Sequence, residues 1–129
     1  MSGEAARILI VEDNRLNLEL ATELLKSSGY AVLQARSAEE GLRMAREQRP
    51  DLILMDVRLP GMDGLTAVRV LKNDPDTRPI PTVAMTAQAM RGDEEAARTA
   101  GFDAYVTKPI DTRALPHTVA RLLAGREST

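Results

Sequence analysis

The chain of 129 residues has no cysteine and no tryptophan, and only two tyrosines and one phenylalanine. Without cysteine, it can form neither a disulfide framework nor a thiolate metal site. With so few aromatic side chains, its core has to be aliphatic. No apolar run approaches the roughly 20 residues that a membrane helix needs, and the first residues lack an apolar signal core. We therefore expect no membrane partner and a cytoplasmic location.

Charge and length narrow the class further. The net charge is −2, from 17 basic and 19 acidic residues, so there is no electrostatic reason to expect nucleic acid as the main partner. Apolar residues make up 43% and charged residues 28%, which is ordinary for a soluble globular protein. The length predicts one domain over residues 1–129, with a core over about 7–124.

Short aliphatic runs alternate with longer segments of helical period along the chain. We predict strands over residues 7–11, 30–35, 51–55, 80–85 and 104–107, and helices over 14–28, 37–48, 63–73, 90–100 and from the last strand to about 124. Crossovers between parallel strands are right-handed in nearly all proteins, which places helices on both faces of the sheet. The predicted fold is α/β, a flavodoxin-like doubly wound (βα)5 with strand order 2-1-3-4-5.

Carboxylate, hydroxyl and ammonium groups stand where the predicted strands end. Glu12 and Asp13 follow the first strand, Asp56 the third, Thr86 the fourth and Lys108 the fifth. The carboxyl ends of the strands form the ligand crevice of an open α/β sheet, so these groups should meet there. Converging carboxylates need a cation, and oxygen ligands without His or Cys favour Mg²⁺ or Mn²⁺ over zinc. The set predicts a site for a divalent cation and a phosphoryl group.

Four runs of the sequence resemble the receiver domains of bacterial two-component response regulators, most closely the stand-alone, chemotaxis-type receivers. They are ILIVEDN, PDLILMDVRLPGMDG, PTVAMTA and YVTKPI, and the resemblance covers about residues 7–124. It implies a single receiver domain with no output domain, which acts as a phosphorylation-dependent switch in signal transduction or a phosphorelay. It implies no enzyme beyond Mg-dependent self-phosphorylation and self-dephosphorylation.

The resemblance assigns the phosphoryl and metal sites. Asp56 would be the phosphoacceptor, forming an aspartyl phosphate with a group taken from a sensor histidine kinase or phosphotransfer protein. Asp13, Asp56 and the backbone carbonyl of Val57 would bind Mg²⁺, and Glu12 would act directly or through a metal-bound water. In-line phosphoryl transfer depends mainly on positioning and charge neutralisation, which agrees with such a set.

The remaining assignments concern the response to phosphorylation. Thr86 and Lys108 would each contact a phosphoryl oxygen, and Tyr105 occupies the aromatic switch position of the family. Arg58 and Gln88 lie two residues past Asp56 and Thr86, at positions that flank the phosphoryl group and help to set its lifetime. Lys108-Pro109 is a plausible cis peptide by the same resemblance. Output would pass to a downstream protein target by direct contact, from a monomer or weak dimer.

Each of these residues also has a purely structural interpretation. Asp13 could be only the N-cap of the first helix, and Asp56 a strand-end turn residue. Thr86 could cap the following segment, and Tyr105 could be a half-exposed strand aromatic. For the whole protein, the alternative is a pseudo-receiver interaction module that works without phosphorylation. The joint presence of Asp13, Asp56 and Lys108 favours the switch.

The last predicted helix contains a proline near its start. If Asp111 caps this helix, Pro116 is its fifth residue and removes the amide bond to the carbonyl of Thr112. An interior proline costs ~3 kcal/mol. Either the helix begins later than Asp111 or its first turn is distorted.

Overall fold

The computed structural model describes residues 5–86 and 91–127, which alternate between strands and helices. The strands are β1 (Arg7–Val11), β2 (Ala31–Ala35), β3 (Leu52–Asp56), β4 (Thr82–Thr86) and β5 (Ala104–Thr107). The helices are α1 (Arg15–Ser27), α2 (Ala38–Gln48), α3 (Gly64–Asn73), α4 (Arg91–Ala100) and α5 (Ala114–Glu127). In this part of the chain all strand pairs are parallel and their order is β2-β1-β3-β4-β5, which confirms the predicted fold.

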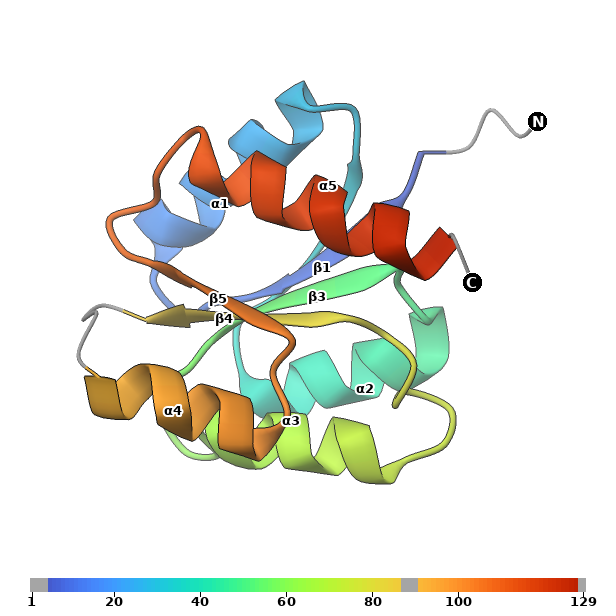
Figure 1. Ribbon diagram of the computed structural model, residues 1–129, viewed down its shortest axis with the longest axis vertical. Coiled ribbons are helices and arrows are strands. Elements are labelled where there is room, and N and C mark those ends of the chain that lie inside the picture. Colours follow the sequence, from blue (N-terminus) through green and yellow to red (C-terminus); the bar gives the residue numbers. More distant parts are fainter. Residues whose placement is uncertain (1–4, 87–90, 128–129) are drawn as a thin grey trace.

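The sheet lies between two layers of helices. Helices α1 and α5 cover one face, and α2, α3 and α4 cover the other (Figure 1). None of the helices in the described ranges combines the length and apolar character that crossing a membrane requires.

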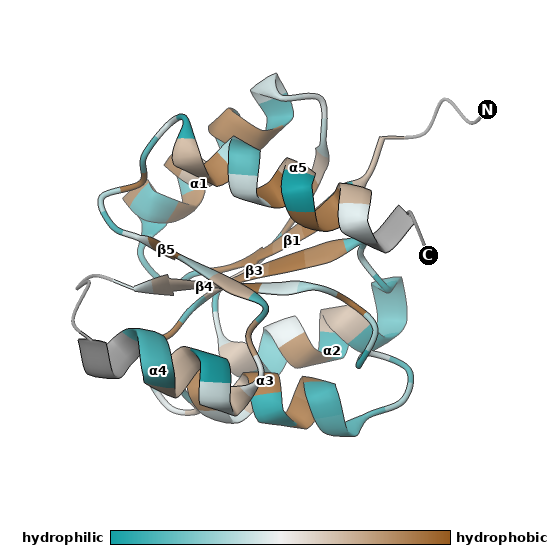
Figure 2. Cartoon of the chain, viewed as in Figure 1, coloured by the Kyte–Doolittle hydropathy of each residue, from teal (hydrophilic) through white to brown (hydrophobic). Residues whose placement is uncertain are grey.

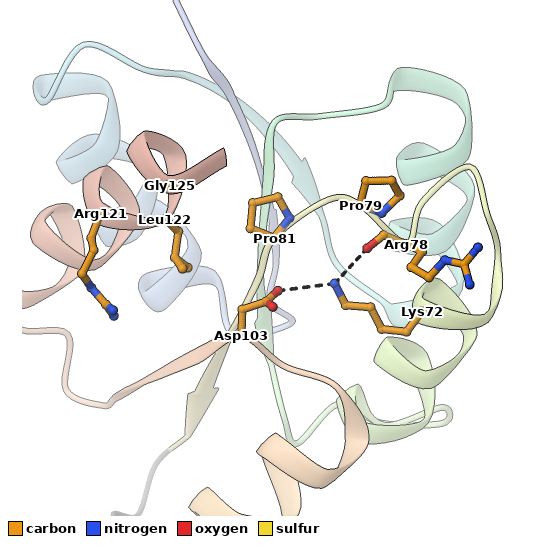
Figure 3. A pocket seen from close by; sticks show the side chains of 8 residues that line it. All are labelled: Lys72, Arg78, Pro79, Pro81, Asp103, Arg121, Leu122 and Gly125. Atoms are coloured by element: carbon orange, nitrogen blue, oxygen red, sulfur yellow. Dashed lines mark hydrogen bonds and ion pairs between the residues drawn. The ribbon is translucent and has the colours of Figure 1, made fainter. Parts of the chain in front are cut away.

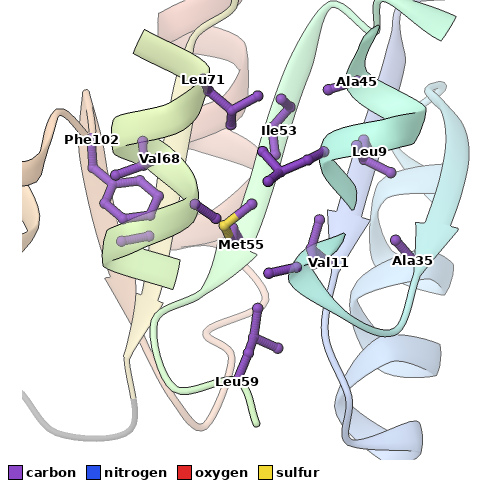
Figure 4. Close-up of a cluster of buried hydrophobic side chains, with 14 of the residues drawn as sticks. Leu9, Val11, Ala35, Ala45, Ile53, Met55, Leu59, Val68, Leu71 and Phe102 are labelled. Carbon is purple, nitrogen blue, oxygen red and sulfur yellow. The ribbon is translucent and has the colours of Figure 1, made fainter. Parts of the chain in front are cut away.

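Each face of the sheet has its own aliphatic core, because successive strand residues point to opposite sides. In β3, Ile53 and Met55 pack under α2 and α3, whereas Leu52 and Leu54 pack under α1 and α5. Figure 4 shows the first of these cores, where Phe102 joins the β3 side chains. The central strands are hydrophobic and the outer helix surfaces largely hydrophilic (Figure 2). Burying one such aliphatic side chain contributes ~1.5–3 kcal/mol, so these strands anchor the fold.

The fourth strand begins later than its sequence predicts. We expected it from Ile80, but β4 begins at Thr82. The amide of Ile80 instead donates to the carbonyl of Thr77 at 3.0 Å, which closes a turn. Pro81 has no amide hydrogen to donate to a neighbouring strand. The apolar run was therefore longer than the segment that can pair.

Asp13 and Asn14 are adjacent and could each begin α1, and the structure shows which of them caps it. Asn14 is the N-cap, and its side chain accepts from the amide of Asn17 at 3.0 Å. The interpretation of Asp13 as that cap is therefore wrong, and its carboxylate is available for another role. At the other end Gly29, at φ 98, turns the chain toward β2, which begins one residue later than predicted because the amide of Tyr30 bonds back to α1.

The last helix resolves the question raised by Pro116. The carboxylate of Asp111 accepts from the amides of Arg113 and Ala114 at 2.8 and 3.0 Å, and these bonds hold the pKa of Asp111 below its usual value. The helix itself begins at Ala114, so Pro116 is its third residue. It ends at Glu127, beyond the predicted 124, because a glycine within a helix costs only ~1 kcal/mol and Gly125 does not stop it.

The first prediction concerns Pro116. The amides of Leu115 and His117 donate to the carbonyls of Asp111 and Arg113 at 3.2 and 3.3 Å, so the proline omits only the bond to the carbonyl of Thr112, an exposed residue whose carbonyl can bond to water instead. Pro116→Ala should change the free energy of unfolding by no more than about 0.5 kcal/mol in urea denaturation. Ala120→Pro, an exposed site inside the same helix, should cost roughly 3 kcal/mol. A gain of several kcal/mol in Pro116→Ala would instead reveal a strained first turn.

Candidate functional site

The polar residues singled out in the sequence gather at the carboxyl edge of the sheet. Glu12 follows β1, Asp56 is the last residue of β3 and Thr86 is the last residue of β4. Lys108 follows β5, and its amide donates to the carbonyl of Thr86 at 2.7 Å. Because β3 lies between β1 and β4, Asp56 stands at the centre of this group.

Three carboxylates meet at this edge. Oxygens of Glu12, Asp13 and Asp56 lie within 4.8 Å of one another. Glu12 is fully buried and Asp56 only 5% exposed, whereas Asp13 is the most exposed of the three. Like charges this close repel, and burial increases the cost of keeping them ionised.

Lys108 supplies positive charge to this cluster. Its Nζ atom lies 2.8 Å from Oδ2 of Asp56 and 2.7 Å from Oε1 of Glu12. Burial alone would lower the pKa of Lys108, but the two carboxylates outweigh it and raise that pKa, so the side chain is an ammonium at neutral pH. The peptide bond that follows, Lys108-Pro109, is cis, as the resemblance predicted.

Glu12 is the least satisfied member of the cluster. Burial raises its pKa, while Lys108 and the amide of Asn14, which donates to Oε2 at 3.0 Å, act in the opposite direction. Although Nζ of Lys108 is close, Oε1 of Glu12 has no hydrogen bond of good geometry. With all groups ionised, three carboxylates against one ammonium leave an excess of negative charge. Oxygen donors with such an excess fit a hard divalent cation such as Mg²⁺.

Both oxygens of Asp56 have partners. Oδ2 accepts from Lys108, and Oδ1 accepts from the amide of Arg58 at 3.0 Å. The turn interpretation of Asp56 is therefore correct for one oxygen, while the other points into the cluster. The Val57 carbonyl accepts from the amide of Gly64 at 2.9 Å, and its second lone pair is compatible with the metal-ligand role that the resemblance implies, which stays a prediction.

Of the two residues expected to affect the lifetime of the phosphoryl group, the structure describes Arg58 but not Gln88. Arg58 is exposed and lies beside the end of β3, where Val57, Leu59 and Leu65 help to line a hollow of about 430 Å³. Gln88 lies outside the described residues, as does the start of the segment that Thr86 was alternatively expected to cap. Thr86 itself is buried, only 3% exposed.

Tyr105 lies on β5 and connects that strand to α4. Its hydroxyl donates to Oε1 of Glu94 at 2.9 Å, and the other oxygen of Glu94 pairs with Arg98 at 2.7 Å. The bond to Glu94 raises the pKa of Tyr105. The ring is half-buried and packs against the core beneath α3 and α4, so the structural interpretation of this residue also describes its position.

Two contacts around the cluster were not predicted from the sequence. The guanidinium of Arg36 donates to the carbonyl of Asp13 at 3.2 Å. Gly64 packs directly against the backbone of Asp56 and Val57. Arg36 follows β2, and the strand order β2-β1 could have placed it beside Asp13. The contact of Gly64 depends on how α3 docks, for which the sequence carries no separate signal.

A second hollow lies at the opposite, amino-terminal edge of the sheet. Its volume is about 630 Å³, and its lining includes Pro81, Leu122 and Asp103 (Figure 3). Lys72 pairs with Asp103 at 3.3 Å and also donates to the carbonyl of Arg78. The charges in this hollow therefore tie the ends of α3, β4 and β5 together, and they are separate from the acidic cluster.

Comparisons with known proteins agree with this geometry. The pattern of the response regulator receiver domain matches residues 8–120. The polar-differentiation response regulator DivK of Brucella anthropi is 47% identical over 116 residues, which cover 90% of this chain and 94% of the relative.

Solved structures show the same likeness. A putative response regulator from Chloroflexus aurantiacus superposes with a TM-score of 0.91 at 33% identity, covering 94% of this chain and 99% of the other. The receiver domain of the sensor histidine kinase PA1611 from Pseudomonas aeruginosa, solved with magnesium coordinated in its active-site cleft, gives a TM-score of 0.87 at 37% identity, covering 93% and 98%. The chain therefore belongs to the response regulator receiver domain family of two-component signalling.

Proposed function

We propose that this protein is a phosphorylation-dependent switch and that Asp56 is its phosphoacceptor. The observation that carries the proposal is the Lys108 ammonium held between the carboxylates of Asp56 and Glu12 at the carboxyl edge of the sheet. The name of the Brucella relative, a polar-differentiation response regulator, supports a signalling role over a metabolic one.

In the proposed reaction, a carboxylate oxygen of Asp56 attacks the phosphorus of a phosphohistidine. The P–O bond to Asp56 forms as the P–N bond breaks, and the imidazole leaves, taking up a proton from solvent. The donor is a sensor histidine kinase or a phosphotransfer protein. Charge in such a loose transition state spreads over the phosphoryl oxygens, so positioned cations and hydrogen-bond donors stabilise it.

Two residues supply that stabilisation from the protein. The Nζ atom of Lys108 already touches the attacking carboxylate, so a phosphoryl group on Asp56 would arrive within reach of the ammonium. The Thr86 hydroxyl stands at the end of the adjacent strand, where it can donate to a second phosphoryl oxygen. A lysine suits the first role because its compact charge sits on a flexible stem and can move with the oxygen it contacts.

Glu12, Asp13 and Asp56 would hold a divalent cation, as their excess of negative charge and oxygen-only chemistry support. When bound, Mg²⁺ neutralises charge on the transferring phosphoryl group. The magnesium in the cleft of the PA1611 receiver structure also supports this choice. The protein's own part is to keep the three carboxylates together without the ion, at the electrostatic cost described above.

The second prediction tests the phosphoacceptor. Wild-type protein incubated with Mg²⁺ and acetyl phosphate should gain a single phosphoryl group, measured by intact mass. Asp56→Asn should gain none, because the amide keeps the shape of the side chain and is not a nucleophile. Asp76→Asn, which changes an exposed carboxylate in the loop before β4, is the matched control and should behave as wild type.

Two outcomes would overturn this assignment. An adduct in Asp56→Asn would place the acceptor elsewhere. No adduct in the wild type, with acetyl phosphate and also with a phosphorylated histidine donor, would favour an interaction module that works without phosphorylation.

The third prediction concerns the metal. A ligand that binds only the folded state stabilises it, by ~2.7 kcal/mol at one hundred times its dissociation constant. Mg²⁺ should therefore raise the Tm of the wild type, and Asp13→Ala should lose this rise. Without Mg²⁺, Asp13→Ala should melt above the wild type, because one of three repelling charges is gone. Asp76→Ala should keep the full Mg²⁺ response; an equal response in Asp13→Ala would show that the ion sits elsewhere.

The fourth prediction concerns Tyr105, which we propose reports phosphorylation to the partner-binding surface. Because the Glu94 bond raises its pKa, the folded state holds the phenol proton more tightly than the unfolded chain. This contribution to stability is complete below pH ~10 and is lost as pH rises through the raised pKa. In a Tyr30→Phe background, absorbance titration should give a midpoint above 10, and adding Glu94→Gln should lower it.

An unchanged midpoint in the Glu94 variant would mean that this bond does not hold Tyr105 in solution. A lowered midpoint would show that the Glu94 carboxylate acts on the Tyr105 hydroxyl in solution. A switch of this kind needs two states that are close in free energy, here with the Tyr105 hydroxyl bonded to Glu94 or released from it.

A further inference from the structure

Helix α3 begins in direct contact with the strand that carries Asp56. A Cβ atom added to Gly64 would lie 2.4 Å from the backbone oxygen of Asp56 and 2.9 Å from Cα of Val57. Ordinary contacts of a Cβ atom begin at 3.4 Å, so any side chain here would force the helix and the strand apart. Glycine is needed at this position because the backbone of Asp56 and Val57 leaves no room for a Cβ atom.

An added Cβ atom at the other described glycines would meet side chains or open space and no backbone atoms. An added Cβ would meet a side chain at Gly41, where Val11 lies at 2.8 Å, and nothing within 4 Å at Gly125. Side chains can change rotamer, whereas the Asp56 oxygen belongs to a central strand. Among the described glycines, Gly64 alone would meet backbone atoms in this way.

Hydrogen bonds and close packing hold the backbone around Asp56 on two sides. On one side the amide of Val57 donates to the carbonyl of Met85 in β4 at 2.9 Å. On the other side the amide of Gly64 donates to the carbonyl of Val57 at 2.9 Å, and Gly64 packs against Asp56 itself. The position of the Asp56 carboxylate relative to Lys108 therefore depends on how closely α3 approaches.

We propose that Gly64 is a positioning residue for phosphoryl transfer, which lets α3 press on the backbone of Asp56 and hold its carboxylate against Lys108. This inference rests on the proposed function of Asp56. The relief of the clash requires a movement of about 1 Å, and a misplacement of that size can lower a reaction rate by ~100-fold. Reduced contact among the three carboxylates should weaken Mg²⁺ binding at the same time.

The test compares Gly64→Ala with Val68→Ala. Val68 is fully buried on the same helix and packs in the core beneath the sheet, so its truncation lowers stability through a cavity and leaves the contact with Asp56 in place. The measurements are the rate of phosphorylation by acetyl phosphate at saturating donor, and the rise in Tm on adding Mg²⁺. Far-UV circular dichroism establishes that each variant is folded.

Gly64→Ala should react ~100-fold more slowly than wild type and lose most of its Mg²⁺ response. Val68→Ala should melt at a lower temperature and yet keep the wild-type rate and response. If the two variants react alike, Gly64 has only a structural role and the proposal is wrong. A wild type that gains no phosphoryl group on Asp56 would instead refute the proposed function, so the two failures are distinct.

A second pair of variants covers the case in which Gly64→Ala does not fold. Asp63 caps α3 by accepting from the amide of Thr66 at 2.9 Å. Asp63→Ala should loosen the start of the helix and slow phosphorylation several-fold, whereas Asp63→Asn keeps a capping oxygen and should restore most of the rate. Equal, wild-type rates in both variants would show that the start of α3 does not control Asp56.

Discussion

The ion pair between Lys108 and the buried carboxylates of Asp56 and Glu12 is the interaction on which the rest of the site depends. Without it, the buried carboxylates of Glu12 and Asp56 would face one another without the ammonium that now lies between them. Strand β4 separates β5 from β3, so a long side chain has to cross it to join them. The short bond from the Lys108 amide to Thr86 fixes the base of that side chain, and its four-carbon stem spans the remainder.

The sequence predicts most of this arrangement because each site residue directly follows or ends an apolar strand. Parallel strands buried on both faces appear as continuous aliphatic runs, and topology then brings their ends together. The pattern of apolar runs in the sequence does not predict details that depend on local backbone geometry. Asp13 and Asn14 are both good caps, and only the fold shows that Asn14 takes this role. The contact of Gly64 with Asp56 depends on how closely α3 docks, which no periodicity encodes.

The two sides of the cluster differ in how the neighbouring backbone is hydrogen-bonded. Asp56 lies between β4 and α3, and hydrogen bonds hold the backbone on both sides. Asp13 lies in the loop before α1, where the exposed side chain of Arg36 provides the contact described. On the proposed function, a nucleophile held by its backbone beside a more exposed carboxylate suits a site that keeps its reacting atom in place while a cation and a large donor enter. Strand β5 lies next to β4, and Tyr105 on β5 bonds to Glu94 on α4. A conformational change at Thr86, the last residue of β4, would therefore reach α4 through the neighbouring strand.

Charge balance links the metal to the phosphoryl group. A phosphoryl group carries about −1.5 to −2 charges at neutral pH, and its bond to Asp56 uses up the −1 of that carboxylate, so the cluster, which already has more carboxylates than cations, becomes more negative by about one charge. On the proposed function, phosphorylation therefore increases the demand for a cation at the same oxygens. Linkage between two ligands is reciprocal, so each must strengthen the binding of the other by the same factor. On the proposed function, the excess negative charge that destabilises the cluster without an ion also makes its phosphorylated state depend on the ion.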